Sequence, residues 1–513
     1  MRVQNSLKNI FFGLSGQFIS MIMGFIVRTV FIYTLGIEYL GIEGLFTSIL
    51  IMLSLANLGF DTAMIYSLYK PIAEEDKYKI QALMNLYKKA YRIIAIVVLI
   101  IGLSLIPFLP YITDGATTIS NINIIYILFL LNSVSSYYFV YKHSIIIADQ
   151  RNHIISKIHS MFIFISNLIQ ITLLLIGLNY ILILSTQIIC RIVENGYIAH
   201  KANLLYPYLK GKNNATLTCN EKKMFFENLY ALLLYKISGV VINGTDNLII
   251  SMFVGIAAVG IYSNYFLIIA TLTTFLSYLF YSITASIGNL IVQEDDEKKY
   301  FIFRVLNFAN FWIYGFCAVC LWNIINPFIT LWLGENYLFD KFIVFAIIVN
   351  FYTAGMQDAA TAFRDASGLF KKGKYRPIIA AVINIVASII LAKVIGIAGV
   401  FLGTVFSRIC TYFWYDPYII FKFVFKKSVK TYFIRYTCYS LLVVICIALI
   451  EGLTILIYPE PINIIIIRGL CSLIIPNILF LMLFKKTDEF KYLFNILRTL
   501  ILRFKYWQLA RDV

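Results

Sequence analysis

Apolar residues run through this chain in long blocks that are separated by short polar segments. Each block reaches about 20 residues, the length that an α-helix needs to cross the hydrocarbon core of a bilayer. Fourteen such spans are predicted, at residues 10–34, 42–68, 90–109, 121–147, 158–178, 180–200, 227–254, 258–286, 302–325, 341–363, 377–394, 397–421, 433–457 and 462–484. A β-barrel is excluded, because its strands alternate apolar and polar residues over short segments. The pattern predicts an all-α, polytopic membrane protein with about 14 transmembrane helices.

The composition agrees with this pattern. The 513 residues are 60% hydrophobic and only 13% charged, whereas a soluble domain is roughly 45–50% apolar and about 25% charged. The first apolar block follows the polar start MRVQNSLKN. It is too long for the apolar core of a cleaved signal and lacks a small-residue cleavage pattern. We therefore interpret it as a retained first span.

The net charge of +17 is distributed unevenly along the chain. With the N-terminus inside, 36 of the 43 Lys and Arg residues fall on the inner side of the predicted spans. Only Lys341 and Lys393 fall on the outer side. This bias predicts that both termini are cytoplasmic, and it accounts for the charge without a nucleic-acid partner.

The segments outside the spans are too short for a folded domain. The longest of them is residues 485–513, where an apolar stripe beside Lys and Arg predicts an amphipathic helix at the membrane interface. The short outer loops argue against a glycosyltransferase or a polymerase. The sequence has no phosphate-binding Gly loop, no clustered carboxylates and no His/Cys ligand set. These observations predict a protein that is not an enzyme and has no cofactor or metal.

An internal repeat relates the two halves of the chain. Gly36 and Gly41 after the first span have the same spacing as Gly255 and Gly260 after the seventh, displaced by 219 residues. Weak internal symmetry of this kind is typical of transporters. Because six spans separate the copies, the repeats are parallel and predict two six-helix lobes. The predicted parts are an N-lobe at 1–204, an inter-lobe loop at 205–226, a C-lobe at 227–421, two extra helices at 433–484 and an amphipathic tail at 485–513.

The repeat also superimposes two polar faces at membrane depth. The displacement of 219 places Gln17 on Lys236, Ser20 on Gly239, Gly24 on Asn243 and Arg28 on Asn247. Close helix packing through small residues explains the glycines, but it does not need a cation. Charges at bilayer depth usually face a cavity, so we favour a shared central cavity. The predicted substrate-binding residues are Arg28, Lys236, Gln17, Ser20, Asn243 and Asn247.

Other intramembrane charges are open to two interpretations. Asp61, Asp246 and Asp358 have no obvious partner nearby in sequence, so each is either an H⁺ or Na⁺ coupling site or a counter-charge of the cavity cations. Arg191 and Glu194 lie one turn apart on the sixth span, which predicts that they neutralise each other.

Several segments resemble the bacterial polysaccharide-transport family of Wzx-like oligosaccharide flippases, which belongs to a larger superfamily of multidrug exporters and lipid flippases. They include RTVFIYTLGIEYLGIEGLFTSILIMLSLANLGF from Arg28, YSLYKPIAEEDKYKIQALMNLYKKAYR from Tyr66 and NGTDNLIISMFVGIAAVGIYSNY from Asn243. A fourth begins at Phe363 with FRDASGLFKKGKYRPIIAAVINIVASIILAKVIGIAGVFLGTVFSR. The resemblance implies a MATE-like, two-lobed bundle with a central cavity and alternating access. It also implies that cavity cations meet the diphosphate of a lipid-linked oligosaccharide, and Arg28 and Lys236 are the candidates here.

These observations give the following functional hypothesis. The protein moves undecaprenyl-diphosphate-linked oligosaccharide repeat units from the inner to the outer leaflet of the bacterial cytoplasmic membrane, for assembly of a surface polysaccharide such as capsule or O-antigen. An H⁺ or Na⁺ gradient supplies the energy, because no nucleotide motif is present. Expected partners are the lipid-linked substrate, membrane lipids and polysaccharide-assembly proteins. The alternatives are an ion-coupled multidrug or small-solute exporter and a flippase for a peptidoglycan or teichoic-acid precursor.

Overall fold

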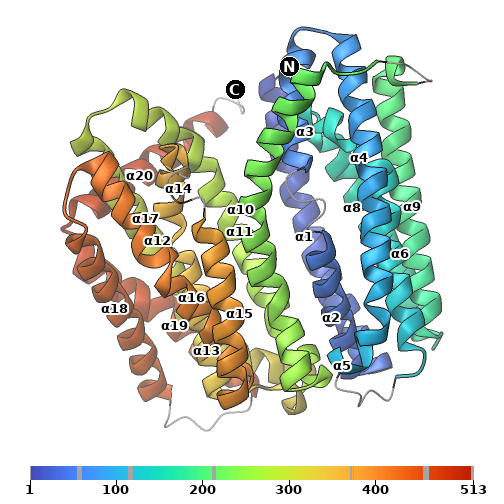
Figure 1. Cartoon of the computed structure of the whole chain (residues 1–513). Helices are drawn as coiled ribbons and strands as arrows, with labels where there is room; N and C mark the ends of the chain where they lie inside the picture. The colour runs from blue at the N-terminus through green and yellow to red at the C-terminus, as the bar shows by residue number, and fades with distance from the viewer. Residues whose placement is uncertain are drawn as a thin grey trace. The chain divides into compact units, whose positions relative to one another are not determined.

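The structure is a computed structural model that describes residues 2–54, 60–113, 119–210, 215–369, 373, 375–454 and 461–509. Every regular element in this part of the chain is helical (Figure 1). The chain divides into two compact units, Met1–Ser263 and Asn264–Val513. The boundary between the units falls inside one long helix, α11 (Ile256–Gln293). The all-α fold class predicted from the sequence is confirmed.

Unit 1 consists of helices of very different lengths. They are α1 (Arg2–Leu35), α2 (Ile37–Leu53), α3 (Phe60–Ala73), α4 (Lys77–Ser104), η2 (Ile106–Phe108), α5 (Leu109–Ile112), α6 (Ile122–Val140), α7 (His143–Ala148), α8 (Asn152–Leu175), α9 (Tyr180–Leu205), η3 (Pro207–Leu209), α10 (Cys219–Phe253) and the start of α11. Unit 2 continues from α11 with α12 (Asp296–Leu333), η4 (Glu335–Tyr337), α13 (Lys341–Gly355), α14 (Asp358–Ala366), α15 (Arg376–Ile395), α16 (Ile397–Cys410), α17 (Tyr412–Ile420), the π-helical turn η6 (Phe421–Phe425), α18 (Lys430–Thr454), α19 (Pro461–Phe484) and α20 (Asp488–Leu509).

Twelve helices in the described part of the chain are long and apolar enough to cross a membrane. They coincide with twelve of the fourteen predicted spans. The predicted span 42–68 corresponds to α2 and α3, and residues 55–59 between them lie outside the described residues. The predicted span 227–254 lies almost entirely within α10. The hydrophobic pattern therefore locates the helices well, although it merges α2 with α3.

The repeat is visible in how the helices begin. Gly36 and Gly255 both have positive φ, at 89° and 117°, where glycine is favoured because it lacks a Cβ. Asp76 caps α4 by accepting a hydrogen bond from the Lys79 backbone N–H, and Asp295 caps α12 by accepting one from that of Lys298. The same displacement of 219 residues relates two more pairs of residues that precede helices, Asn121 with Asp340 and Gly177 with Gly396. The displacement inferred from the sequence thus relates helix starts in both halves.

The long α10 is fixed at its start by an N-terminal capping box. The Thr218 side chain and the Glu221 carboxylate each bond the other's backbone N–H, which satisfies donors that the first helical turn leaves free. Glu221 also pairs with Lys79 of α4 at 2.7 Å. The bond with Lys79, together with the two Thr218 bonds, lowers the pKa of Glu221 to about 2. These contacts connect the N-terminal end of α10 to α4 within unit 1.

In unit 2 the amphipathic helix α20 is bound to two membrane helices through one carboxylate. Glu489 pairs with Arg304 of α12 at 3.0 Å and with Arg435 of α18 at 2.7 Å. Its side chain is only 8% exposed. Phe490 stacks on Trp312 of α12, with ring centroids 5.8 Å apart. The predicted amphipathic tail is therefore a helix whose first turn is part of the core of unit 2.

Candidate functional site

Two glycines bring α2 and the start of α11 into backbone contact inside unit 1. A Cβ on Gly41 would lie 2.1 Å from the carbonyl oxygen of Ile256, and a Cβ on Gly260 would lie 2.4 Å from the carbonyl oxygen of Ile37. Under the displacement of 219 residues, Gly41 corresponds to Gly260 and Ile37 corresponds to Ile256. The two contacts are therefore the same contact made in both directions, as in a two-fold symmetric interface. We call these four residues the glycine junction.

The neighbouring turns of the same helices extend this symmetry. Gly44 faces the hydroxyl of Ser263, which is its own counterpart in the second repeat. Asn247 of α10 donates hydrogen bonds to the Ser48 hydroxyl at 2.9 Å and to the Gly44 carbonyl at 3.3 Å. Helix α2 of the first repeat is thus hydrogen-bonded to α10 of the second and packs closely on the start of α11, at a place where only small residues fit.

Arg28 of α1 and Glu43 of α2, next to this junction, carry opposite charges that interact electrostatically without forming a direct ion pair among the described residues. Both side chains are half-buried, and each is the other's electrostatic partner. Moving a charged side chain out of water costs roughly several kcal/mol unless an opposite charge offsets that cost. The electrostatic interaction therefore explains why both charges are tolerated here. Nη1 of Arg28 is buried and finds no hydrogen-bond acceptor among the described residues. This N–H group of Arg28 therefore remains available as a donor to a further hydrogen-bond acceptor.

Aromatic side chains line the same region of unit 1. Tyr180, at the start of α9, is 2% exposed and interacts electrostatically with both Arg28 and Glu43. Its ring lies edge-on to Phe31 and to Tyr39, with ring centroids 5.5 Å and 5.3 Å apart. Edge-to-face packing of this kind is a favourable arrangement of aromatic rings. The charges of Arg28 and Glu43 therefore lie close to a group of packed aromatic rings.

The predicted substrate-binding residues have different environments. Ser20 donates its hydroxyl to the Gly16 carbonyl of its own helix at 2.9 Å, and Gln17 is half-buried on the next turn. Asn247 uses its amide N–H group to bind α2, whereas its buried Oδ1 has no partner among the described residues. The side chains of Lys236 and Asn243 lie outside the described residues.

Two of the three predicted ion-coupling residues are described, and they belong to different units. Asp246 is 8% exposed and interacts electrostatically with Tyr262 of α11, in unit 1. Asp358 begins α14 in unit 2 and accepts a hydrogen bond from the Tyr314 hydroxyl at 2.7 Å. The side chain of Asp61 lies outside the described residues. Among the described residues, no group of three or more His, Cys, Asp or Glu side chains is arranged to hold a metal ion.

Sequence reasoning missed Glu43, which is the charge that accompanies Arg28. The signal was present, because Glu43 follows Gly41 in the repeated turn motif. That motif was interpreted as a turn, whereas α2 already begins at Ile37 and places Glu43 on its second turn. Under the displacement of 219, Arg28 and Glu43 correspond to Asn247 and Tyr262. The charged pair therefore occurs in the first repeat and a neutral polar pair in the second.

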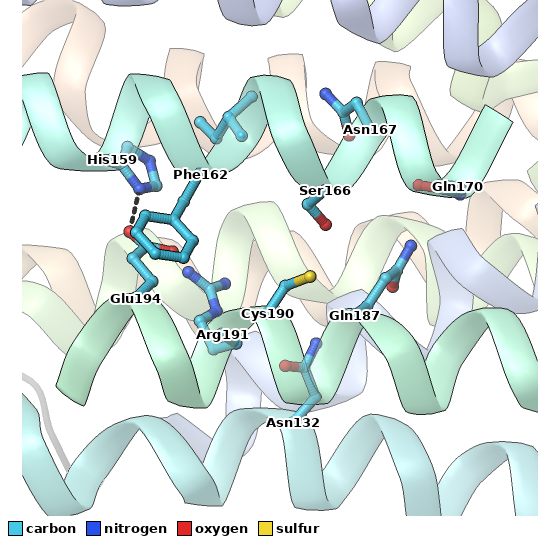
Figure 2. A pocket seen from close by; sticks show the side chains of 11 residues that line it. Asn132, His159, Phe162, Ser166, Asn167, Gln170, Gln187, Cys190, Arg191 and Glu194 are labelled. Carbon is cyan, nitrogen blue, oxygen red and sulfur yellow. Dashed lines mark hydrogen bonds and ion pairs between the residues drawn. The ribbon is translucent and has the colours of Figure 1, made fainter. Parts of the chain in front are cut away.

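A second polar region of unit 1 lies among α6, α8 and α9. It contains an open cavity of about 270 Å³ whose lining includes Gln170, Gln187 and Arg191 (Figure 2). Glu194 pairs with the imidazole of His159 across the two helices at 2.6 Å. Among the described residues Glu194 forms no direct ion pair with Arg191, although both side chains line this cavity, so their mutual neutralisation stays a prediction.

No family model and no curated protein matches this chain. Among solved structures, the lipid II flippase MurJ in an inward closed conformation aligns with a TM-score of 0.62 at 18% identity, over 92% of this chain and 99% of that one. An inward-facing multidrug resistance transporter of the MATE family, in the MOP superfamily, gives a TM-score of 0.55 at 13% identity, over 78% of this chain and 94% of that one. A mutant of the MATE transporter VcmN of Vibrio cholerae gives 0.58 at 12% identity, over 83% and 99% of the two chains. The chain therefore has the fold that these flippase and transporter structures share.

Proposed function

We propose that this protein moves an undecaprenyl-diphosphate-linked oligosaccharide from the inner to the outer leaflet of the bacterial cytoplasmic membrane. The observation that carries the proposal is the half-buried Arg28, whose buried Nη1 has no acceptor among the described residues. A diphosphate supplies acceptor oxygens and negative charge, and charge-assisted bonds from arginine to phosphate are among the strong hydrogen bonds. The fold, shared with a lipid II flippase structure, supports the same proposal.

Each side chain of the site has a role in this proposal. The diphosphate approaches Arg28, whose guanidinium interacts electrostatically with Glu43. Gln17 and Oδ1 of Asn247 bond sugar or phosphate groups, together with Ser20, Lys236 and Asn243. An H⁺ or Na⁺ gradient drives the cycle, and Asp246, which is buried in the same unit as Arg28, is the proposed coupling residue.

The glycine junction closes the outer end of the pathway in this proposal. The turns at Gly36 and Gly255 lie on the outer side when both termini are cytoplasmic. Contact between Gly41 and Ile256 then seals that side, and separation of the junction releases the substrate outward. Such gating by movement of one repeat against the other is the general scheme of transporters built from repeats.

Depletion of the protein in its native host provides the test. We expect a lipid-linked oligosaccharide to accumulate on the cytoplasmic side, where mass spectrometry of extracted lipids identifies it. Complementation with Arg28→Ala should reduce export at least tenfold at equal protein level, because one lost charge-assisted bond corresponds to about that factor. The control is Thr34→Val on the same helix, whose hydroxyl bonds its own backbone. Full export by the Arg28 variant would refute the role of the cation.

One observation favours a second candidate function, an ion-coupled exporter of amphipathic cations. Glu43 lies beside Tyr180, and Tyr39 packs on the same ring. A carboxylate next to aromatic faces is an arrangement that attracts organic cations. If the protein has this second function, a strain that lacks it would become sensitive to a fluorescent cation such as ethidium. No lipid-linked sugar would accumulate in that strain.

A further inference from the structure

Helices α4 and α6 of unit 1 pack against each other and run in opposite directions (Figure 1). The Tyr126 hydroxyl on α6 donates a hydrogen bond to the Gly102 carbonyl near the end of α4, at 3.0 Å. Nearer the start of α4, Tyr91 stacks on Tyr137 of α6, with ring centroids 6.1 Å apart. The next turn beyond this stack therefore brings the first half of α4 level with the end of α6. This level is cytoplasmic in the orientation that the charge distribution predicts.

Three cations lie at this level, and we call them the cation cluster: Lys88, Arg92 and Lys142. Lys88 and Arg92 are one turn apart on α4. Lys142 follows α6, and its Nζ donates a hydrogen bond to Oδ1 of Asn203 on α9 at 2.9 Å. Burial lowers the pKa of Lys142, and repulsion by the charge of Lys88 lowers it further. Arg92 interacts electrostatically with the hydroxyl of Tyr141, the residue before Lys142. The three cations therefore lie close together although like charges repel.

The cation cluster has no carboxylate partner in the described part of the chain. None of its members forms an ion pair there, and the group that binds the Lys142 ammonium is the neutral amide of Asn203. No carboxylate of the described residues raises the pKa of Lys142. The acidic residue closest to Lys142 in the sequence is Asp149, which Arg151 already binds at 2.9 Å. Because a half-buried cation is costly without an opposite charge, the cluster favours an anionic group from outside the protein.

An exposed apolar surface begins one turn from the cluster, on the side of the membrane core. Ile96, four residues after Arg92 on α4, and Tyr138, four residues before Lys142 on α6, are each 55% exposed. Ile100 continues this exposed face of α4 by a further turn. Both helices are long and apolar enough to cross a membrane, so these side chains contact hydrocarbon in a bilayer. Cations next to such a surface match a molecule that has an anionic head and hydrocarbon chains, whereas a free phosphate would use only the cations.

We propose that the cation cluster binds the phosphate of one anionic phospholipid, whose acyl chains lie along the exposed faces of α4 and α6. Lys88 and Arg92 donate to the phosphate oxygens from α4, and Lys142 donates from the end of α6. Charge-assisted hydrogen bonds to phosphate are among the strong ones, and basic pockets between membrane helices on the cytoplasmic side are suited to lipid headgroups. This inference concerns a lipid that stays with the protein, and it does not depend on the transport function proposed above.

Native mass spectrometry of the full-length protein, released from a neutral detergent, counts the lipids that stay bound. The probes are phosphatidylglycerol and phosphatidylcholine with the same acyl chains, and inorganic phosphate as a competitor. We expect one phosphatidylglycerol to bind at least tenfold more tightly than phosphatidylcholine, because the cations attract a net negative headgroup. Inorganic phosphate at the same concentration should leave it bound, because it lacks the acyl chains.

Variants decide whether the lipid occupies this cluster. Lys142→Gln should weaken phosphatidylglycerol binding about fivefold, and glutamine at all three positions about a hundredfold, since each cation near an anionic lipid contributes about a factor of five. Lys89→Gln is the matched control, because it removes the same charge from an exposed position on α4 outside the cluster. Its affinity should stay within about twofold of the wild type. Equal melting temperatures without added lipid show that the variants fold, and the single variant alone decides if the triple variant does not.

Four results would each overturn the proposal. They are equal binding of the two lipids, wild-type affinity in Lys142→Gln, an equal loss in Lys89→Gln, and displacement of phosphatidylglycerol by inorganic phosphate at the same concentration. The last result would show a site for a free anion instead of a lipid. All four are measured on purified protein, so they are independent of whether deletion blocks export.

Discussion

Gly41 and Ile256 lie in direct contact, because a Cβ on the glycine would approach the isoleucine carbonyl oxygen to 2.1 Å. Gly260 and Ile37 repeat this contact with the roles of the two halves exchanged. A reciprocal contact of this kind makes each side depend on the other, because any side chain added at either glycine pushes the same pair of helices apart. The glycine junction is therefore the place where the internal repeat of the sequence becomes a physical interface.

Replacement of either junction glycine by alanine should destabilise this interface. Gly41→Ala and Gly260→Ala each add a methyl group against backbone atoms that cannot rotate away. Overpacking of this kind costs about 1–3 kcal/mol, so the melting temperature of the purified protein should fall. Under the proposed function, both variants also favour the state in which the outer side is open.

The matched control for this pair is Gly196→Ala on α9. A Cβ there meets no atom within 4 Å, and alanine in a helix interior is more favourable than glycine by roughly 0.5–1 kcal/mol. This variant should therefore melt at or above the wild-type temperature. If Gly41→Ala or Gly260→Ala melts at or above the wild-type temperature, as expected for Gly196→Ala, the close contact at the glycine junction does not contribute to stability.

A double-mutant cycle on Arg28 and Glu43 separates stability from transport. Arg28→Met or Glu43→Met alone leaves one half-buried charge without its electrostatic partner and should destabilise the protein, by less than the roughly 3–5 kcal/mol that a fully buried uncompensated charge costs. The double variant should be more stable than either single variant, because it leaves no unpaired charge. Its melting temperature and its export are measured together. Restored stability without restored export would assign Arg28 to the substrate, whereas restoration of both would assign the pair to structure alone.

Acid should release the first turn of α20 from unit 2. Burial alone raises the pKa of Glu489, but its bonds with Arg435 and Arg304 outweigh burial and hold the pKa below the ordinary glutamate value of 4.5. A group whose pKa is lowered in the folded state stabilises that state above its unfolded pKa. The contribution is therefore complete above pH 4.5 and is lost as the pH falls through the lower, folded value.

Trp312 fluorescence reports this release, because the indole stacks on Phe490 of α20. The signal of interest is the difference between the wild type and Trp312→Phe. We expect an acid transition with a midpoint below pH 4.5. It should be absent in Glu489→Gln, in which the helix is already loosened at neutral pH. The same acid transition in the glutamine variant would contradict this assignment.

The sequence predicted what depends on local pattern and missed what depends on contacts between distant residues. Helices follow from the length and hydrophobicity of each span, and the repeat follows from the spacing of glycines. Arg28 was identifiable because a cation inside an apolar span is unusual. Its partner Glu43 was not, because its position depends on how α2 packs on α1. Asn247 likewise looked like a free polar group until the fold brought it to Ser48.

The final prediction concerns a buried ion cluster in unit 2. Asp416 of α17 is 1% exposed and pairs with Arg364 of α14 at 2.8 Å and with Arg376 at the start of α15. Asp416→Asn removes the charge that compensates two buried guanidinium groups. An uncompensated buried charge costs about 3–5 kcal/mol, so the melting temperature in detergent should drop sharply.

Asp365 provides the matched comparison for Asp416, because it also pairs with Arg364, at 2.7 Å, but its side chain is 45% exposed. Exposed ion pairs contribute about 0–1 kcal/mol, so Asp365→Asn should melt close to the wild type. The two variants make the same chemical change against the same arginine and differ in burial and in the second arginine that only Asp416 contacts. Equal losses of melting temperature would mean that burial of this cluster does not determine its contribution to stability. A large difference would show that Asp416 holds α14, α15 and α17 together from the inside of unit 2.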